Sequence, residues 1–453
     1  MLSAQRGLTC LLALALAGAS ISACATQSGQ GEIGPDDNAP FADDGKADDP
    51  SAPAYSNSRR DIISTSLDVN LATRHATADV RVATSTSRGM TFEAQGLNVT
   101  GVHSAAGAEL EHAVSGGKLY VNVPGGRWPT NIVVDYTFDV QHENNGWLGA
   151  STVTWPYFCG NLFPCRSATR DGSAFALNLT GVPSGQTAIY PSTIDEEAPA
   201  YMLAWAVGNY ECQSLGTTDA GTDLKVCWLP RGKTAALAGT AHLVDVFNWY
   251  ETNLGPYMFG SDVGAVSVNW GESGAGGMEH HPYWHVDDAS MASEETQAHE
   301  AAHGWYGDGV RIACWEDFVL SEGTVTYLAA HALGEVAGDE LEEATWASYQ
   351  EDLDYALENE EHTNAWPQGC GQIDLLNDHY FTMIPYIKGA MFYRSLAREI
   401  GEEALDGVLA TFYQSHAGQA MHMQDMLSTI ETETGFDPTN LARHWLRNSG
   451  DPQ

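Results

Sequence analysis

The sequence is poor in basic residues. Its 453 residues contain 20 Lys and Arg against 59 Asp and Glu, which gives a formal net charge of −39 at pH 7. A chain this acidic is repelled by phosphate backbones and by anionic lipid headgroups. The composition therefore excludes nucleic acid and an anionic membrane surface as main partners. The hydrophobic fraction of 43% and the aromatic fraction of 10% are typical of a globular protein, and 453 residues are enough for two or three domains.

Long apolar runs are also lacking, except for one near the N-terminus. Arg6 precedes the run "LTCLLALALAGASISA", which is too short to span a membrane and predicts a signal peptide over residues 1–23. The letters "ISAC" end at Cys24 and resemble a bacterial lipobox, so we expect an exported lipoprotein of the bacterial cell envelope. Its membrane attachment would be this lipid anchor alone. The alternative is plain secretion after cleavage near Ala23.

Residues 24–57 have few apolar side chains. They are rich in Asp, Gly, Pro and Ser, and such a segment buries too little surface to fold. It predicts a flexible acidic tether between the anchor and a folded body.

The cysteines contain no C-x-x-C pair, which argues against a cysteine zinc site. Cys10 leaves with the signal peptide and Cys24 is the candidate anchor. The six that remain in an exported chain predict disulfides. Proximity in sequence favours Cys159–Cys165, Cys212–Cys227 and Cys314–Cys370, although six cysteines allow other connectivities.

The spacing of apolar residues changes near residue 230. Segments such as "TSLDVNL" and "NIVVDYTFDV" alternate apolar and polar residues, which predicts a largely antiparallel β domain over residues 58–230. Residues 231–453 are mainly helical in pattern. They begin with one helix that stops at Gly255, followed by a strand over Val263–Trp270. No repeats are present. The sequence predicts an α+β multidomain protein.

The stretch "HEAAH" carries the clearest chemistry. His299 and His303 are four residues apart, so on a helix both imidazoles point to one side and can bind one metal ion. Ser293 is a suitable N-cap for that helix. Glu300 can act as the general base toward a water molecule. Glu322 follows His303 after eighteen intervening residues, on an expected second helix, and would complete a three-ligand catalytic zinc site.

Several motifs in order resemble the aminopeptidase N-like family of zinc metallopeptidases, which also contains leukotriene hydrolase. "HEAAHGWYGD" with "SEG" is similar to the family's zinc signature, "GGMEH" to its exopeptidase motif, and "PYIKGA" to its Tyr-x-Lys-Gly segment. "GPYMFGS" and "EAPAYMLAWAVGNYE" are similar to further family sequences. The resemblance covers nearly the whole ordered chain. It implies an N-terminal saddle-like β domain followed by a thermolysin-like zinc peptidase domain.

The resemblance also implies a role for each matching residue. One Zn²⁺ would be bound by His299, His303 and Glu322. Glu300 would take the proton of the attacking water, and the hydroxyl of Tyr386 would stabilise the oxyanion. Glu279 would hold the substrate's α-ammonium group, while Gly276, Gly277 and Met278 would supply backbone beside the extended substrate.

The sequence departs from the family pattern at two places. His280 stands where the exopeptidase motif usually has Asn. The family commonly supplies a second amine-binding Gln or Glu shortly before a Phe-Pro-Cys element, and "TVTWPYFCGNLFPC" has the triplet at Phe163–Cys165 without such a residue.

Other side chains near these motifs leave alternatives open. His280, His281 and His285 are either a second metal site or a polar rim of the substrate cleft. Cys314 is either a soft ligand or half of a disulfide. Asp308 either supports the metal ligands from behind or is only a helix-end residue.

These observations predict a zinc aminopeptidase that removes N-terminal residues from peptides. The alternatives are an endopeptidase or atypical zinc peptidase, and a non-catalytic tethered protein that binds zinc or peptides. Because the sequence ends soon after "LARHWLRNSGDP", we expect an open site and a monomer.

Overall fold

The computed structural model describes residues 52–271 and 276–450. The predicted signal peptide, the candidate anchor Cys24 and the tether up to residue 51 lie outside the described residues.

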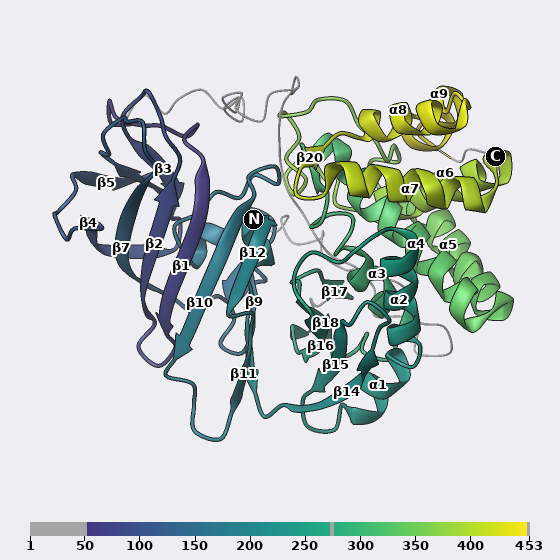
Figure 1. The fold of residues 1–453 in the computed structure, drawn as a ribbon, viewed down its shortest axis with the longest axis horizontal. Coiled ribbons are helices and arrows are strands. Elements are labelled where there is room, and N and C mark those ends of the chain that lie inside the picture. Colours follow the sequence, from purple (N-terminus) through teal and green to yellow (C-terminus); the bar gives the residue numbers. More distant parts are fainter. Residues whose placement is uncertain (1–51, 272–275, 451–453) are drawn as a thin grey trace, which may run out of the picture.

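The first part of the chain is built around a six-stranded sheet, drawn in purple and blue in Figure 1. The strand order is β12-β10-β1-β2-β7-β4, and all neighbours are antiparallel except β1 and β10. In β1, Thr65, Leu67 and Val69 are buried while Ser66 and Asp68 are exposed. This alternation confirms the predicted β pattern. The strands are β1 (Ile62–Asn70), β2 (His75–Val82), β4 (Leu97–Ser104), β7 (Thr130–Phe138), β10 (Ser173–Thr180) and β12 (Thr193–Ala198).

Small sheets flank this sheet. A three-stranded sheet has the order β3-β6-β5, and β8 with β9 and β11 with β13 form two-stranded pairs. Their bounds are β3 (Met90–Glu93), β5 (His112–Ser115), β6 (Lys118–Val121), β8 (Gly146–Trp147), β9 (Thr152–Val153), β11 (Thr187–Ile189) and β13 (Ala206–Gly208).

A second, five-stranded sheet starts the other part of the molecule. Its order is β14-β15-β16-β18-β17, in which β15, β16 and β18 run parallel. The predicted boundary at residue 230 would separate β15 from its partner β16, so we group β14 and β15 with the second part. The bounds are β14 (Glu211–Thr217), β15 (Asp223–Trp228), β16 (Asp262–Val268), β17 (Gly277–Met278) and β18 (Tyr283–Asp287).

Helices make up most of the remaining chain and lie to the right of the sheets in Figure 1. A short strand pair, β19 (Arg311–Ile312) with β20 (Ala420–Met421), joins distant segments. The helices are α1 (Lys233–Gly239), α2 (Leu243–Asn253), α3 (Glu294–Ala302), α4 (Phe318–Ala337), α5 (Asp339–Asn359), α6 (Ile384–Ile400), α7 (Glu402–His416), α8 (Met423–Thr434) and α9 (Thr439–Ala442).

The prediction of one continuous helix ending at Gly255 is wrong, because α1 and α2 are separate and α2 ends at Asn253. The break follows Gly239, which packs so closely on the backbone of Met291 that a Cβ would overlap its carbonyl oxygen. The Thr240 hydroxyl donates back to the carbonyl of Ala236 at 2.7 Å. The backbone N–H of His242 donates to Glu294 at 3.2 Å, so the connection is tied to α3.

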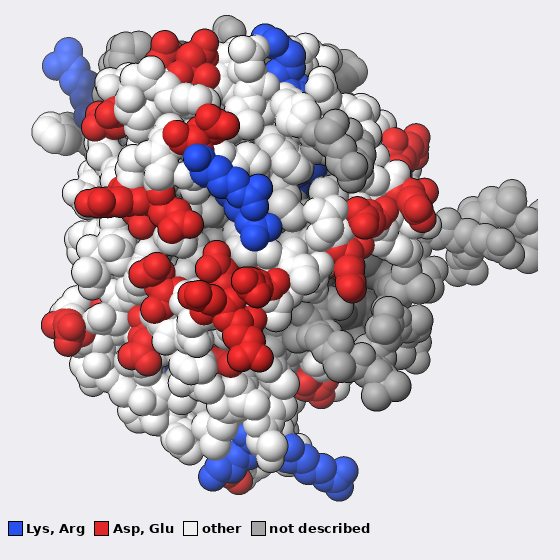
Figure 2. All heavy atoms as spheres, turned by 90° about the vertical axis from the view of Figure 1, so that its right-hand side faces the viewer, with Lys and Arg blue, Asp and Glu red and all other residues white. Residues whose placement is uncertain are grey.

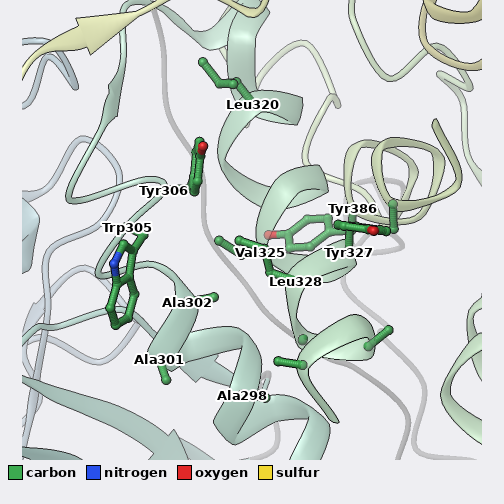
Figure 3. Close-up of a cluster of buried hydrophobic side chains, with 14 of the residues drawn as sticks. Ala298, Ala301, Ala302, Trp305, Tyr306, Leu320, Val325, Tyr327, Leu328 and Tyr386 are labelled. Atoms are coloured by element: carbon green, nitrogen blue, oxygen red, sulfur yellow. The ribbon is translucent and has the colours of Figure 1, made fainter. Parts of the chain in front are cut away.

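A large apolar core holds α3, α4 and α6 together. Figure 3 shows Ala298, Ala301 and Ala302 of α3 in one buried cluster with Val325 and Leu328 of α4. Small alanine side chains let α3 lie close to α4. Two glycines bring α4 close to α6 in the same way, because a Cβ on Gly323 would lie 2.6 Å from the Cα of Gly389.

All three disulfides favoured by sequence proximity are present: Cys159–Cys165, Cys212–Cys227 and Cys314–Cys370. Cys314 is therefore a disulfide partner rather than a metal ligand.

The acidic composition is visible on the surface. On the face shown in Figure 2, Asp and Glu side chains clearly outnumber Lys and Arg. Within residues 52–271 and 276–450, no helix has the length and apolar character needed to cross a membrane.

Candidate metal centre

Helix α3 carries the two predicted histidine ligands. Its N-cap is Ser293, whose side chain accepts a hydrogen bond from the N–H of Thr296 at 3.1 Å, as predicted. His299 and His303 stand one turn apart, with their Nε2 atoms 3.3 Å from each other. The four-residue spacing thus brings both imidazoles to one point.

Helix α4 brings the third candidate ligand to the same point. Oε2 of Glu322 lies 3.2 Å from Nε2 of His299 and 3.4 Å from Nε2 of His303. All three side chains are buried. Burial alone raises the pKa of Glu322, but the charge of His303 and the bonds to both histidines outweigh it and lower that pKa to about 2. Glu322 is therefore an anionic oxygen donor beside two nitrogen donors.

The other ring nitrogens of the histidines have partners of their own. Nδ1 of His303 lies 2.9 Å from the carbonyl oxygen of Tyr306, which can only accept. Nδ1 of His299 lies 3.4 Å from the hydroxyl of Thr326, whose own proton goes to the carbonyl of Glu322 at 2.6 Å. Each Nδ1 can therefore donate its proton to its own partner, which leaves each Nε2 available to bind a metal ion. This donor set fits a zinc ion.

Glu300 lies beside the candidate metal ligands. Both of its carboxylate oxygens are buried and have no hydrogen-bond partner among the described residues. Burial raises the pKa of Glu300 well above its ordinary value, and the charge of His303 opposes this. Such a carboxylate is a strong acceptor for a water proton.

Strand β17 passes directly over Glu300. A Cβ on Gly277 would lie 2.5 Å from Cδ of Glu300, so only glycine permits this approach. Gly276 has a φ of 54° and its carbonyl accepts from the N–H of Asp287 at 2.9 Å. Met278 is buried and pairs with His285 in the sheet. Of the three predicted backbone residues, Gly277 thus lies directly against the predicted base, and Gly276 and Met278 are its neighbours in the chain.

Glu279 follows β17 and belongs to the same group of side chains. Carboxylate atoms of Glu279 and Glu300 and a ring nitrogen of His303 lie within 4.8 Å of one another. Burial raises the pKa of Glu279 to about 6, although the charge of His303 lowers it. A second carboxylate thus lies immediately beside the base and one candidate ligand.

Tyr386 approaches from the first turn of α6. Its ring stacks on the ring of His299, with centroids 5.9 Å apart and planes at 20°. It also makes an edge-to-face contact with Phe318, with ring centroids 5.6 Å apart. The Gly323–Gly389 contact explains the approach, because it lets α6 lie against the helix that carries Glu322.

The histidines after Glu279 are tied into the fold. The ring nitrogens of His281 contact the Tyr257 hydroxyl at 2.7 Å and the Glu300 carbonyl at 2.8 Å. Nδ1 of His280 lies 3.0 Å from Nδ1 of His285. All three rings are buried, so they do not form an exposed rim. Among the described residues, they are not part of any group that could hold a metal ion.

Sequence reasoning missed Tyr201, which comes from the short turn Ala200–Met202 before β13. Its hydroxyl donates to Oδ1 of Asp308 at 3.2 Å and also interacts with Glu279. The segment "EAPAYMLAWAVGNYE" contains Tyr201, but the pattern of its residues does not indicate that it reaches the site.

Comparisons with known proteins agree with this geometry. Residues 279–445 match the Peptidase family M1 domain. The chain is 24% identical over 302 residues to leucine aminopeptidase 2 of Emericella nidulans, and 28% identical over 169 residues to aminopeptidase N of Streptomyces lividans. These matches cover 60% and 36% of this chain but only 46% and 19% of the relatives, so the chain spans less than half of their length.

Solved structures extend the likeness to both parts of the fold. An M1 zinc metallopeptidase from Deinococcus radiodurans matches with a TM-score of 0.73 at 17% identity, covering 87% of this chain and 96% of that one. Yeast LTA4 hydrolase matches with the same TM-score and identity, covering 87% of this chain and 68% of that one. The two-part α+β fold predicted from the sequence is therefore confirmed.

Proposed function

We propose that the chain is a zinc-dependent aminopeptidase of the aminopeptidase N-like M1 family, with one Zn²⁺ held by His299, His303 and Glu322. The match of residues 279–445 to the M1 domain and the likeness to aminopeptidases and M1 zinc metallopeptidases support this proposal. The observation that carries the proposal is the position of Glu279, whose carboxylate lies within 4.8 Å of Glu300 and His303. A carboxylate so close to the base leaves room for only one residue between the substrate's ammonium group and the bond that is cut.

The proposed mechanism assigns each step to a side chain. Bound zinc would act as a Lewis acid that polarises the scissile carbonyl and makes water more acidic. Glu300 accepts the proton of the attacking water and passes it to the leaving amine. The hydroxyl of Tyr386 donates to the carbonyl oxygen as negative charge develops there. Glu279 binds the ammonium group and so fixes the register of the peptide.

Peptides are the proposed substrates. A solved relative from Deinococcus radiodurans was crystallised with Tyr-Ser-Ala, which supports a peptide rather than another amide as the substrate class. Residues Gly276 and Gly277 support the same choice, because backbone beside the base can pair with an extended peptide.

The decisive experiment compares one peptide with its N-acetylated form. The zinc-loaded protein should release the first residue of the free peptide, lose this activity with a chelator and regain it with zinc. The acetylated peptide should be cut far more slowly, because it has no ammonium group for Glu279. Equal cleavage of both would favour an endopeptidase instead, and no cleavage of either would favour a non-catalytic binding protein.

We also propose that the protein is exported and carries a lipid at Cys24. The pairing of all six cysteines between Cys159 and Cys370 supports an oxidising compartment. In membrane fractions of producing cells, Cys24→Ala should move the protein to the soluble fraction; unchanged membrane association would contradict lipidation. A monomer is proposed as well, and the mass in solution from light scattering tests it.

A further inference from the structure

Asp308 lies in the loop after α3 and is completely buried. Its Oδ1 accepts the hydrogen bond from the Tyr201 hydroxyl at 3.2 Å. Its Oδ2 has no hydrogen-bond partner among the described residues. A buried carboxylate oxygen without a donor is costly, so it points to a donor supplied from outside the chain.

Tyr201 stands between two carboxylates. Its hydroxyl interacts with Glu279 as well as with Asp308. A phenol has one proton and can satisfy one carboxylate at a time. Tyr201 therefore cannot donate to Glu279 and Asp308 at the same time, and a third group with several N–H bonds could donate to both carboxylates.

The charges of the site favour a cation at this place. Four buried carboxylates belong to it: Glu279, Glu300, Asp308 and Glu322. A divalent ion compensates two of these charges, which leaves an excess of negative charge on the side away from Glu322. An ammonium group would relieve this repulsion and bring three N–H donors.

The geometry argues against the two simpler roles for Asp308. Nδ1 of His303 bonds to the carbonyl of Tyr306 and Nδ1 of His299 contacts Thr326, so the Asp308 carboxylate orients neither ring. Helix α3 ends at Ala302, and the carboxylate bonds to the Tyr201 hydroxyl from another part of the chain, not to the helix terminus.

We propose that Asp308 is a second substrate-binding carboxylate, which binds the N-terminal ammonium group of the peptide together with Glu279. This inference rests on the proposed function and names its amine-binding residues. It also accounts for the missing Gln or Glu before Phe163–Cys165, because the second anchor comes from the loop after α3 instead. Tyr201 holds Asp308 in place and is a positioning residue.

Two hydroxamates that differ only in the amino group test the proposal. Calorimetry of the zinc-loaded protein gives the Kd of L-leucine hydroxamate and of 4-methylpentanohydroxamic acid, which lacks the amine. In the wild type, L-leucine hydroxamate should have the lower Kd, and the ratio of the two Kd values measures the gain from the amine. In Asp308→Asn, this ratio should shrink roughly ten- to hundredfold, because one charge-assisted hydrogen bond is lost. Glu279→Gln should show a loss of similar size, and the Kd of the amine-free compound should stay unchanged in both.

Asp171→Asn is the matched control, since Asp171 is also a buried aspartate but pairs with Arg166 in the first part of the chain. It should keep the full gain from the amine. If Asp308→Asn loses zinc or cooperative unfolding, Asp308→Glu replaces it and should retain most of the gain because it keeps the charge. An unchanged gain in a zinc-loaded Asp308→Asn protein would overturn the proposal. These titrations need no turnover, so they are separate from the test of peptide hydrolysis.

Discussion

Gly323 and Gly389 meet where α4 packs against α6, and a methyl group on Gly323 would lie 2.6 Å from the Cα of Gly389. Gly323 directly follows the candidate ligand Glu322, and Gly389 lies three residues after Tyr386. This contact therefore sets the distance between the third ligand and the proposed oxyanion donor.

We predict that Gly389→Ala separates the two helices. Overpacking at this contact should cost about 1–3 kcal/mol of unfolding free energy and should lower kcat, because Tyr386 moves with α6. Urea unfolding and steady-state kinetics check both. The control is Gly407→Ala in α7, where an added Cβ meets nothing within 4 Å. Gly407→Ala should leave the unfolding free energy unchanged or raise it by up to about 1 kcal/mol. Equal unfolding free energies and equal kcat values for Gly389→Ala and Gly407→Ala would show that the Gly323–Gly389 contact does not position Tyr386.

Gly277→Ala should disable the base without removing the metal. The added Cβ would lie 2.5 Å from Cδ of Glu300, so the carboxylate must move. We expect kcat to fall on the order of 100-fold, while the zinc content stays at the wild-type level. Gly126→Ala is a suitable control, since its Cβ would meet nothing within 4 Å. Wild-type kcat in Gly277→Ala would show that Glu300 does not need its present position.

Lys388 should be among the most sensitive positions for stability. Its buried ammonium donates to the backbone carbonyls of Thr363, Asn448 and Gly450 at 2.6, 3.0 and 2.8 Å. Lys388→Met leaves these carbonyls without that donor and should cost about 3 kcal/mol or more in urea unfolding. Lys225→Met is the comparison, because the Lys225–Asp262 pair is partly exposed and such pairs contribute about 0–1 kcal/mol. A cost of similar size for both would contradict this assignment.

The His331–Asp406 pair predicts a pH-dependent part of the stability. Nε2 of His331 lies 3.1 Å from Oδ1 of Asp406. Burial lowers the pKa of His331, but Asp406, Glu402 and Glu335 outweigh it and the net pKa is raised. The His331–Asp406 pair therefore contributes its full stabilisation below the pKa of His331 in the unfolded chain, about 6.5. This contribution is lost as pH rises through the higher pKa of His331 in the folded protein. The difference in unfolding free energy between wild type and His331→Gln should shrink above that pH; a difference that grows with pH would contradict the sign.

The sequence predicts the parts of the site that depend on local geometry. His299, Glu300 and His303 follow from helical periodicity, and the N-cap at Ser293 follows from its side-chain chemistry. Glu322 is predicted from its place on an expected second helix, while the role of Tyr386 follows from the family resemblance. The sequence does not predict how either residue approaches α3, because that depends on how α4 and α6 pack. The two-part fold follows from the change in apolar spacing near residue 230.

The remaining features depend on contacts between distant segments. Tyr201 reaches Asp308 across 107 positions of the chain, and no local pattern indicates such a contact. The pairing of β15 with β16 joins strands on both sides of the predicted boundary. The break between α1 and α2 results from the close packing of Gly239 on Met291, which helical propensity does not report.

The most direct test of the account is Glu300→Gln, measured for zinc content and for turnover of a free peptide. Gln is nearly the same size as Glu but cannot take up the water proton. We expect wild-type zinc content, because His299, His303 and Glu322 are untouched, and a loss of kcat of roughly 10²–10⁴-fold. Full zinc content with wild-type turnover would contradict the role of Glu300 as the base and with it the proposed mechanism.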